Sequence, residues 1–448
     1  MRKPWMFLTL FAVVMTGFGI TKAAAQVTLE PDVNLGGTPL NAIARYRYPT
    51  GQVPKIAFLA IHRTSDYRNH ASAVELPLRG FATLGIRTRF GSSDAAVNFE
   101  QIALDIRNGI RFLKSKGHSK IILVGHSGGG PSTSYYQALQ ENGPSYCQGR
   151  KKLTQCPFTE ADFTPADKAD GIVYLDAHPG VGVNQLRSLN GSIVNEDQPF
   201  GPARNPTLDP FDPNHGYNED GNSIYSAKFV DKYSQAQARR MNGLIEEAQL
   251  ITKKIALGLI ETTDPNDLTK HPFPIFRANA RMVQLSTEVQ CCTQHPTRLL
   301  QDSNGTTTAP QIIHTVRVST PDIKDDDQDE TVFENLSITS FLSANAIRAK
   351  HSLDESKIDW CSTNNSTPCA VAQIRVPTLV MAMQGHYFIR DGEFIYESAA
   401  SLDKEFLVVQ GATHGLGNCN NCPGAPYLNV RKNIFDYVAN WANKSGRF

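Results

Sequence analysis

Six short apolar stretches punctuate the chain, and each has the length of a buried strand. They cover residues 55–62, 86–90, 120–125, 171–175, 377–383 and 406–409. Most of them are continuous apolar runs rather than alternating patterns, which is typical of strands covered on both faces, as in parallel sheets. The pattern therefore predicts a mostly parallel sheet.

Segments between these stretches repeat apolar residues at helical spacing. Residues 99–116 place Ile102, Ile106 and Ile110 four positions apart, and Gly117 follows as a helix terminator. Residues 131–140 and 427–441 are further predicted helices. Strands that alternate with helices predict an α/β fold, in which helices cover both faces of the sheet.

The long interval between the stretches at 171–175 and 377–383 has a different character. Residues 184–222 are rich in Asn, Pro, Gly and Asp, which predicts loop. Residues 227–260 and 334–350 instead show helical spacing. The interval is therefore predicted to be a large, mainly helical insert.

These patterns predict three parts in the chain. Residues 26–177 and 376–448 form the α/β core, and residues 178–375 form an insert or lid domain. We expect the insert to lie over the carboxyl edge of the sheet, where ligands bind in folds of this kind. Residues 1–25 precede the folded protein.

Residues 1–25 have the pattern of a secretory signal peptide. Arg2 and Lys3 precede an apolar run at residues 5–20, and Ala23 and Ala25 fit the small-residue rule for cleavage. The run is shorter than the roughly 20 residues that a membrane-spanning helix requires. We expect cleavage after Ala25 and a secreted or periplasmic protein with no integral membrane segment.

The composition narrows the range of partners. Of the 448 residues, 40% are hydrophobic, which suffices for a large core and excludes a disordered chain. The 44 Lys and Arg residues nearly balance the 43 Asp and Glu residues, so the formal net charge is +1. We therefore expect no nucleic-acid partner, because such partners require a basic excess or a basic patch.

All eight cysteines follow the predicted signal peptide: Cys147, Cys156, Cys291, Cys292, Cys361, Cys369, Cys419 and Cys422. An even number in an exported chain indicates disulfides. Cys147 and Cys156 could close one short loop, and Cys361 and Cys369 could close another. The last two form a C-x-x-C motif, and the adjacent pair could bond each other or two separate partners. The alternative is a zinc site with four thiolate ligands, namely Cys291, Cys292, Cys419 and Cys422. Such a site usually has two C-x-x-C motifs, and this set has only one.

The strongest chemical motif is Gly125-His126-Ser127-Gly128-Gly129, which joins a predicted strand to a predicted helix. This is the G-x-S-x-G pattern of a nucleophile elbow. Its turn is so tight that side chains two positions from the serine would collide, which requires Gly125 and Gly129. A phosphate-binding loop would instead need Lys-Ser or Lys-Thr after the glycines.

With this motif in this context, the chain resembles the α/β-hydrolase superfamily over residues 26–177 and 376–448. The resemblance implies the order nucleophile, acid, histidine along the chain. The family places its histidine near the C-terminus, after the last strand, and His414 follows the stretch at 406–409 there. His414 would take the proton of the Ser127 hydroxyl, and a third residue would orient its imidazole.

The acid is left open by the resemblance. The family most often places it behind the strand before the last one, where Asp391 and Glu393 both come late. A minority, including pancreatic-type lipases, takes the acid one strand earlier. Asp176 directly follows the stretch at 171–175 and fits that position. We prefer Asp176, with Glu393 and then Asp391 as alternatives.

The resemblance also implies an oxyanion hole of two backbone N–H groups. One is expected from Gly128, and the other from the loop that follows the first apolar stretch, near His62, Arg63 or Thr64, with Arg63 as the first candidate. Arg63 stands where many esterases have glycine, but any residue other than proline supplies an N–H. The Arg63 side chain could also meet an anionic substrate group, or it could point into water.

Together these residues imply a serine hydrolase of carboxylesterase or lipase type (EC 3.1.1) that needs neither a metal nor an organic cofactor. Its substrate would be a small-molecule, lipid or polyester ester. An amidase or a carbon–carbon hydrolase with the same triad is an alternative. A non-catalytic binding protein on the same scaffold is another, although such proteins usually lack the serine or the histidine.

Overall fold

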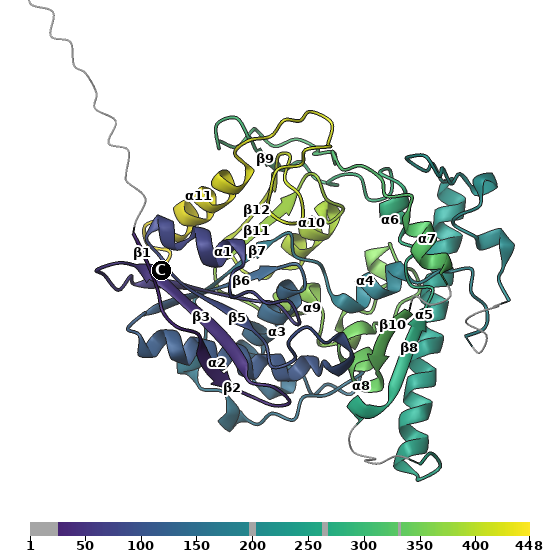
Figure 1. The fold of residues 1–448 in the computed structure, drawn as a ribbon, viewed down its shortest axis with the longest axis horizontal. Coiled ribbons are helices and arrows are strands. Elements are labelled where there is room, and N and C mark those ends of the chain that lie inside the picture. The colour runs from purple at the N-terminus through teal and green to yellow at the C-terminus, as the bar shows by residue number, and fades with distance from the viewer. Residues whose placement is uncertain (1–25, 197–202, 262–267, 330–332) are drawn as a thin grey trace, which may run out of the picture.

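The computed structural model describes residues 26–196, 203–261, 268–329 and 333–448 (Figure 1). The predicted signal peptide, residues 1–25, lies outside the described residues. None of the helices in the described ranges combines the length and the apolarity that a membrane span requires.

A ten-stranded sheet occupies the centre of the molecule. From edge to edge its strands are β1 (Val27–Leu29), β3 (Ala42–Pro49), β5 (Ala82–Arg87), β4 (Ile56–Ile61), β6 (Lys120–His126), β7 (Gly171–Leu175), β11 (Thr378–Met383), β12 (Lys404–Val409) and β9 (Arg298–Leu300), and β2 (Val33–Gly36) pairs with β3. All pairs from β5 to β9 are parallel, whereas β1, β2 and β5 pair with β3 in antiparallel fashion. The mostly parallel sheet is thus confirmed.

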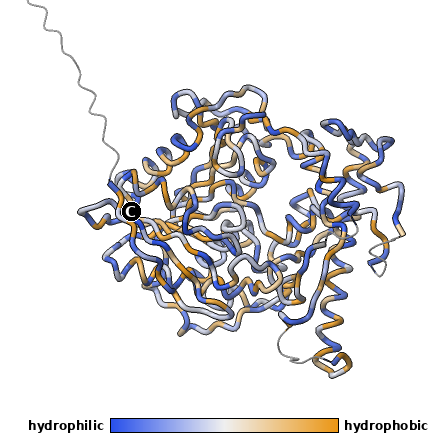
Figure 2. Tube along the Cα trace, viewed as in Figure 1, coloured by the Kyte–Doolittle hydropathy of each residue, from blue (hydrophilic) through white to orange (hydrophobic). Residues whose placement is uncertain are grey.

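Helices cover both faces of this sheet, because its central strands bury side chains on both sides. In β4, Leu59 and Ile61 join one buried cluster, and Phe58 and Ala60 join the other. The first face carries α2 (Ile102–Ser115), α3 (Gly129–Asn142), α9 (Thr367–Val371) and α10 (Ile389–Ser398), and the second carries α1 (Ala71–Glu75) and α11 (Val430–Ala442). Hydrophobic residues follow the central strands accordingly (Figure 2). This strand order, with its antiparallel start, is that of the α/β-hydrolase fold.

The predicted insert combines helices with irregular segments. The predicted helix at 227–260 is confirmed as α5 (Ala227–Ala256), which runs along the right-hand side of Figure 1. Shorter helices in this interval include α4 (Val181–Ser188), α6 (Met282–Leu285) and α7 (Ile323–Gln328). Of these, α4 overlaps at residues 184–188 with the range predicted to be loop.

The predicted helix at 334–350 is only partly confirmed. Its first residues form β10 (Phe333–Ser337), which pairs antiparallel with β8 (Pro272–Phe276), and the helical part is limited to α8 (Ile338–Ser340) and the π-helix Phe341–Asn345 that follows it. Leu336 on β10 packs in the same apolar cluster as Ile275 of β8. Pairing with a strand far away in sequence therefore overrides the helical spacing at the start of this segment.

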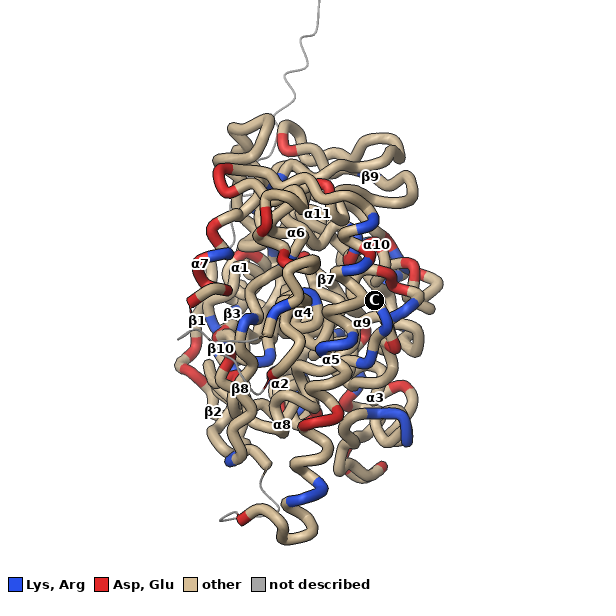
Figure 3. The backbone as a smooth tube through the Cα atoms, turned by 90° about the vertical axis from the view of Figure 1, so that its right-hand side faces the viewer, with Lys and Arg blue, Asp and Glu red and all other residues tan. Residues whose placement is uncertain are grey.

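The interval 178–375 is also tied into the core. Strand β9, from within it, extends the main sheet beside β12, and α9 packs against α3. Charged residues of both signs are interspersed along the chain in the view that faces α5 (Figure 3), in keeping with the nearly balanced composition.

The first residue of α3 lies tightly against the core. A Cβ atom on Gly129 would be 2.2 Å from the carbonyl oxygen of Ile61 at the end of β4. We expect Gly129→Ala to lower the free energy of unfolding by about 1–3 kcal/mol, as overpacking does, in denaturant titrations.

Gly243 provides the matched control, since it is exposed on α5 and a Cβ there would have nothing within 4 Å. Gly243→Ala should raise the free energy of unfolding by roughly 0.5–1 kcal/mol, because alanine favours a helix interior. Equal effects of the two substitutions would contradict tight packing at Gly129.

Candidate active site

Ser127 occupies a sharp turn between β6 and α3. Its φ of 54° lies in the left-handed region, which costs a non-glycine residue about 1–3 kcal/mol. A Cβ on Gly125 would be 2.6 Å from Thr133 Oγ1 and 2.8 Å from the carbonyl oxygen of Gly129. Only glycine therefore fits at this position, and the turn holds the serine at the amino end of α3.

The structure brings Ser127, His414 and Asp176 together in one hydrogen-bonded line. His414, on the loop between β12 and α11, has its Nε2 3.0 Å from Ser127 Oγ. Its Nδ1 lies 2.7 Å from Oδ2 of Asp176, which follows β7. A carboxylate, an imidazole and a hydroxyl are thus arranged so that the imidazole can accept the hydroxyl proton while the carboxylate fixes its orientation.

Asp176 is completely shielded from solvent and firmly held. Its Oδ1 accepts a 3.0 Å hydrogen bond from the Met383 N–H at the end of β11. Burial by itself raises the pKa of Asp176, but the charges and hydrogen bonds of His386 and His414 outweigh it, so the pKa stays below its ordinary value. The carboxylate is therefore ionised at neutral pH.

The two alternative acids lie elsewhere, on α10. Asp391 accepts hydrogen bonds of 2.9 and 2.8 Å from Arg187 Nη1 in a buried ion pair. Glu393 accepts two hydrogen bonds of 2.7 Å each, from the backbone N–H groups of residues 294 and 295. Neither has a hydrogen bond to His414, so both carboxylates are committed to other partners.

Two further histidines enclose His414. The ring of His126 is centred 4.7 Å from that of His414 on one side, and the ring of His386 is centred 4.4 Å away. His126 Nε2 donates a 2.7 Å hydrogen bond to the His414 carbonyl oxygen, which anchors its backbone. His386 Nδ1 lies 2.7 Å from the same Asp176 oxygen that His414 contacts.

Sequence reasoning did not single out His386 for this place. A signal was present, since His386 comes three residues after β11, and the carboxyl ends of parallel strands meet at one sheet edge. A lone histidine behind a strand has no characteristic spacing, however, and only the folded arrangement reveals its contact with Asp176.

The loop after β4 approaches the turn at Ser127. His62 Nδ1 accepts hydrogen bonds from the Thr64 and Ser65 N–H groups at 3.1 and 2.9 Å, and burial lowers the pKa of His62 to about 3. The ring is therefore neutral, with its proton on Nε2. A Cβ on Gly128 would be 2.7 Å from that nitrogen, so the loop and the turn are in contact.

The N–H groups of Gly128 and Arg63 are both available. No hydrogen bond between described residues uses either of them. The Arg63 side chain forms an ion pair with Asp94 and lines a cavity of 320 Å³ next to the loop. The Gly128 donor thus lies directly beside Ser127, the Arg63 donor follows the His62 that contacts Gly128, and the cationic Arg63 side chain borders the adjoining cavity.

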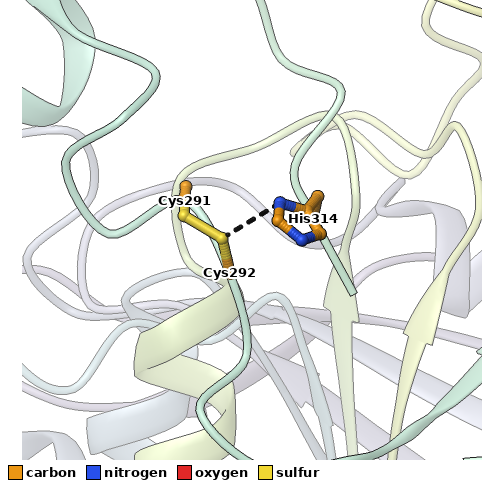
Figure 4. A group of neighbouring side chains, drawn as sticks. All are labelled: Cys291, Cys292 and His314. Carbon is orange, nitrogen blue, oxygen red and sulfur yellow. Dashed lines mark hydrogen bonds between the residues drawn. A yellow bond between two sulfur atoms is a disulfide. The ribbon is translucent and has the colours of Figure 1, made fainter. Parts of the chain in front are cut away.

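The structure joins the eight cysteines in four disulfides: Cys147–Cys156, Cys291–Cys292, Cys361–Cys369 and Cys419–Cys422. The two predicted short loops are closed, and the adjacent pair is bonded internally (Figure 4). His314 Nδ1 lies 3.3 Å from Cys292 Sγ. Since all four sulfurs of the rival zinc site are in disulfides, none of them is a thiolate ligand.

The Cys419–Cys422 disulfide packs beneath the loop that carries His414. The Cys419 N–H donates a 2.8 Å hydrogen bond to the Gly411 carbonyl oxygen. A Cβ on Gly385 would be 3.1 Å from Cys422 Sγ, so the disulfide also touches the segment that leads to His386. The disulfide therefore links the two segments that position these histidines.

Replacing both of these cysteines by serine should loosen the histidine loop. By loop-closure entropy, removal of so short a cross-link costs about 2 kcal/mol, which for a chain of this length lowers Tm by roughly 2 °C. We expect this fall in Tm in calorimetry, together with a lower kcat on any turned-over substrate.

The Cys147–Cys156 disulfide is the matched control, because it closes a similarly short loop in the cluster on the α2–α3 face. Its double serine variant should lower Tm and leave kcat unchanged. An unchanged kcat in Cys419→Ser with Cys422→Ser would show that the disulfide does not position His414.

Comparison with known proteins finds similarity to solved structures but not to family models or curated sequences. No family model matches the sequence, and no curated protein matches it. Similar solved structures include an esterase domain from Rhodothermus marinus (12% identity over 93% of this chain and 98% of that one, TM-score 0.37). Brefeldin A esterase, described as a bacterial homologue of human hormone sensitive lipase, is 9% identical over 94% of this chain and 78% of its own chain, with a TM-score of 0.41. Proline iminopeptidase of Mycobacterium smegmatis is 11% identical over 92% of this chain and 97% of its own chain, with a TM-score of 0.39. Similarity this low says nothing of activity.

Proposed function

We propose that this chain, an α/β-hydrolase in its strand order, is a serine hydrolase that cleaves carboxylic esters through an acyl-enzyme on Ser127. The observation that carries the proposal is the continuous line of hydrogen bonds from Asp176 through His414 to Ser127. The serine in this line sits on a strained turn at the amino end of a helix. Such a combination is typical of an activated nucleophile.

The reaction follows from these contacts. His414 Nε2 takes the proton as Ser127 Oγ attacks the ester carbonyl, and it then gives the proton to the departing alkoxide. Asp176 holds the Nδ1–H of His414 and stabilises the imidazolium that forms. Water, deprotonated by the same imidazole, then releases the acid and restores the serine hydroxyl.

The oxyanion of each tetrahedral intermediate would accept hydrogen bonds from the N–H groups of Gly128 and Arg63. Two observations support this role. Neither N–H donates a hydrogen bond to another described residue, and the loop that carries His62 contacts Gly128. The amino end of α3 adds a favourable dipole at the same point. The backbone N–H of Arg63 can fill this role although many esterases have glycine at this position, because the donor belongs to the main chain.

The setting of the enzyme is part of the proposal. Four disulfides favour an oxidising compartment, and the N-terminal pattern favours export, so we assign a secreted or periplasmic location. The segment 178–375 would cover the pocket as a lid, since it supplies most of the residues around the cavity beside Arg63.

Asp176 and Asp391 offer a matched test of which acid serves His414. Asp176→Asn should lower kcat on 4-nitrophenyl butyrate by roughly 10³–10⁴-fold, because an amide stabilises the wrong imidazole tautomer. Asp391→Asn should keep kcat within a few-fold but lower stability by about 3–5 kcal/mol, because Arg187 is left buried and unpaired.

Steady-state hydrolysis and thermal unfolding of the two variants distinguish these effects. A large loss of kcat in Asp391→Asn with full activity in Asp176→Asn would overturn the assignment of the acid. If wild-type protein with a normal melting transition hydrolysed no ester in a Ser127-dependent way, a binding protein on the same scaffold would be the better interpretation.

A further inference from the structure

The cavity beside Arg63 adjoins the candidate nucleophile. It has a volume of 320 Å³ and lies between the loop after β4 and the segment 178–375. His178 lines its wall on the side of the turn: its N–H donates a 3.4 Å hydrogen bond to the Ser127 carbonyl oxygen, and its Nε2 would be 3.2 Å from a Cβ on Gly128. A group bound in this cavity would be part of a substrate whose carbonyl meets Ser127.

The walls of this cavity are predominantly polar. Only Val181 and Leu336 among the lining residues are apolar, and the charged side chains are Arg63, Asp94, Arg281 and Glu334. An alkyl chain would bury these groups without satisfying them, at a cost for each polar group. The lining therefore disfavours long-chain lipid or aliphatic polyester in this space.

The guanidinium of Arg281 forms no ion pair with a described residue, although the carboxyl group of Glu334 lies within its electrostatic reach. The hydrogen bonds of Arg281 go to neutral oxygens. These include Gln284 Oε1 at 3.0 Å, the Tyr387 hydroxyl at 3.1 Å and Ser188 Oγ. Its Nε–H is buried without an acceptor. A half-buried cation of this kind attracts an anionic ligand.

Arg63 adds a second cationic group to the lining of this cavity. Its Nη1 binds Asp94, but no hydrogen bond between described residues uses its Nη2, and its buried Nε also lacks an acceptor. The charges of Arg63 and Arg281 both act on His178, whose pKa is held far below its ordinary value by burial and by these cations. Both arginines thus influence the same space next to Ser127.

From this arrangement we infer that the cavity binds a carboxylate of the substrate between Arg63 and Arg281. The inference rests on the proposed function and narrows it to esters that bear a carboxylate within a few atoms of the scissile carbonyl, such as half-esters of short dicarboxylic acids. Arginine suits this role because its planar group matches the two oxygens of a carboxylate.

Glu334 makes this binding dependent on pH. It is faced by Arg63, Arg281 and Asp94, and burial raises its pKa to about 7 although the two arginines act against this. Below that value Glu334 is neutral, and above it a second carboxylate in the cavity repels the substrate anion. Binding of an anionic ester should therefore weaken as the pH rises from 6 to 8.

Matched pairs of esters test the inference. We expect wild-type kcat/KM to be at least 10-fold higher for mono-4-nitrophenyl adipate than for its neutral isostere, 4-nitrophenyl 6-methylheptanoate. A second pair, 4-carboxyphenyl acetate and phenyl acetate, tests the case in which the carboxylate lies on the leaving group.

Arg281→Gln should lower kcat/KM for the preferred anionic ester by about 10- to 100-fold, the range for a hydrogen bond to a charged group. The neutral partner should change by less than twofold.

Three variants make the result specific. Arg281→Lys keeps the charge and should retain part of the preference. Arg239→Gln removes an exposed arginine from α5 and should change nothing. Glu334→Gln should remove the decline in the anion-to-neutral kcat/KM ratio between pH 6 and 8.

A binding measurement separates this inference from the proposed function. Free adipate should raise Tm in wild type and in Ser127→Ala, and this shift should vanish in Arg281→Gln. Hydrolysis of neutral esters with no preference in either pair and no shift in Tm would overturn the inference and leave the ester hydrolase intact. A shift in Tm without any ester hydrolysis would overturn the proposed function and keep the anion site.

Discussion

The register of neighbouring parallel strands is the constraint on which the candidate site depends. His126 at the end of β6 lies opposite Leu175 of β7, which in turn lies opposite Met381 of β11. Ser127 and Asp176 are the next residues along their strands, so residues from separate parts of the chain meet at one sheet edge. A shift by one residue would turn these side chains to the other face. The apolar cores on both faces of the sheet fix that register.

Much of this framework could be predicted from the sequence, because buried strands and a tight glycine turn have strong local patterns. Strand β3 lacks a continuous apolar run because polar residues such as Arg45 alternate with its buried positions, and β9 is only 3 residues long. Residues 334–337 were predicted as part of a helix because the apolar spacing continues into them, whereas pairing with β8 makes them a strand. Local patterns do not report partners that are distant in the chain.

The surroundings of the triad depend even more on tertiary contacts. Arg281 and Glu334 come from segments with no motif, and only their convergence with Arg63 gives the cavity its charge. His386 similarly gains meaning from one contact with Asp176. In the proposed function, the core would supply the reaction chemistry through its strand ends, and the segment 178–375 would supply most of the polar wall against which a substrate is selected.

Covalent labelling of Ser127 tests the central claim most directly. Mature protein would be treated with a fluorophosphonate, which reacts only with an activated serine, and the modified peptide would be identified by mass spectrometry. The account predicts a single adduct on Ser127 that is lost or formed far more slowly in His414→Ala. An adduct elsewhere, or an equal labelling rate in His414→Ala, would contradict the claim that His414 activates Ser127.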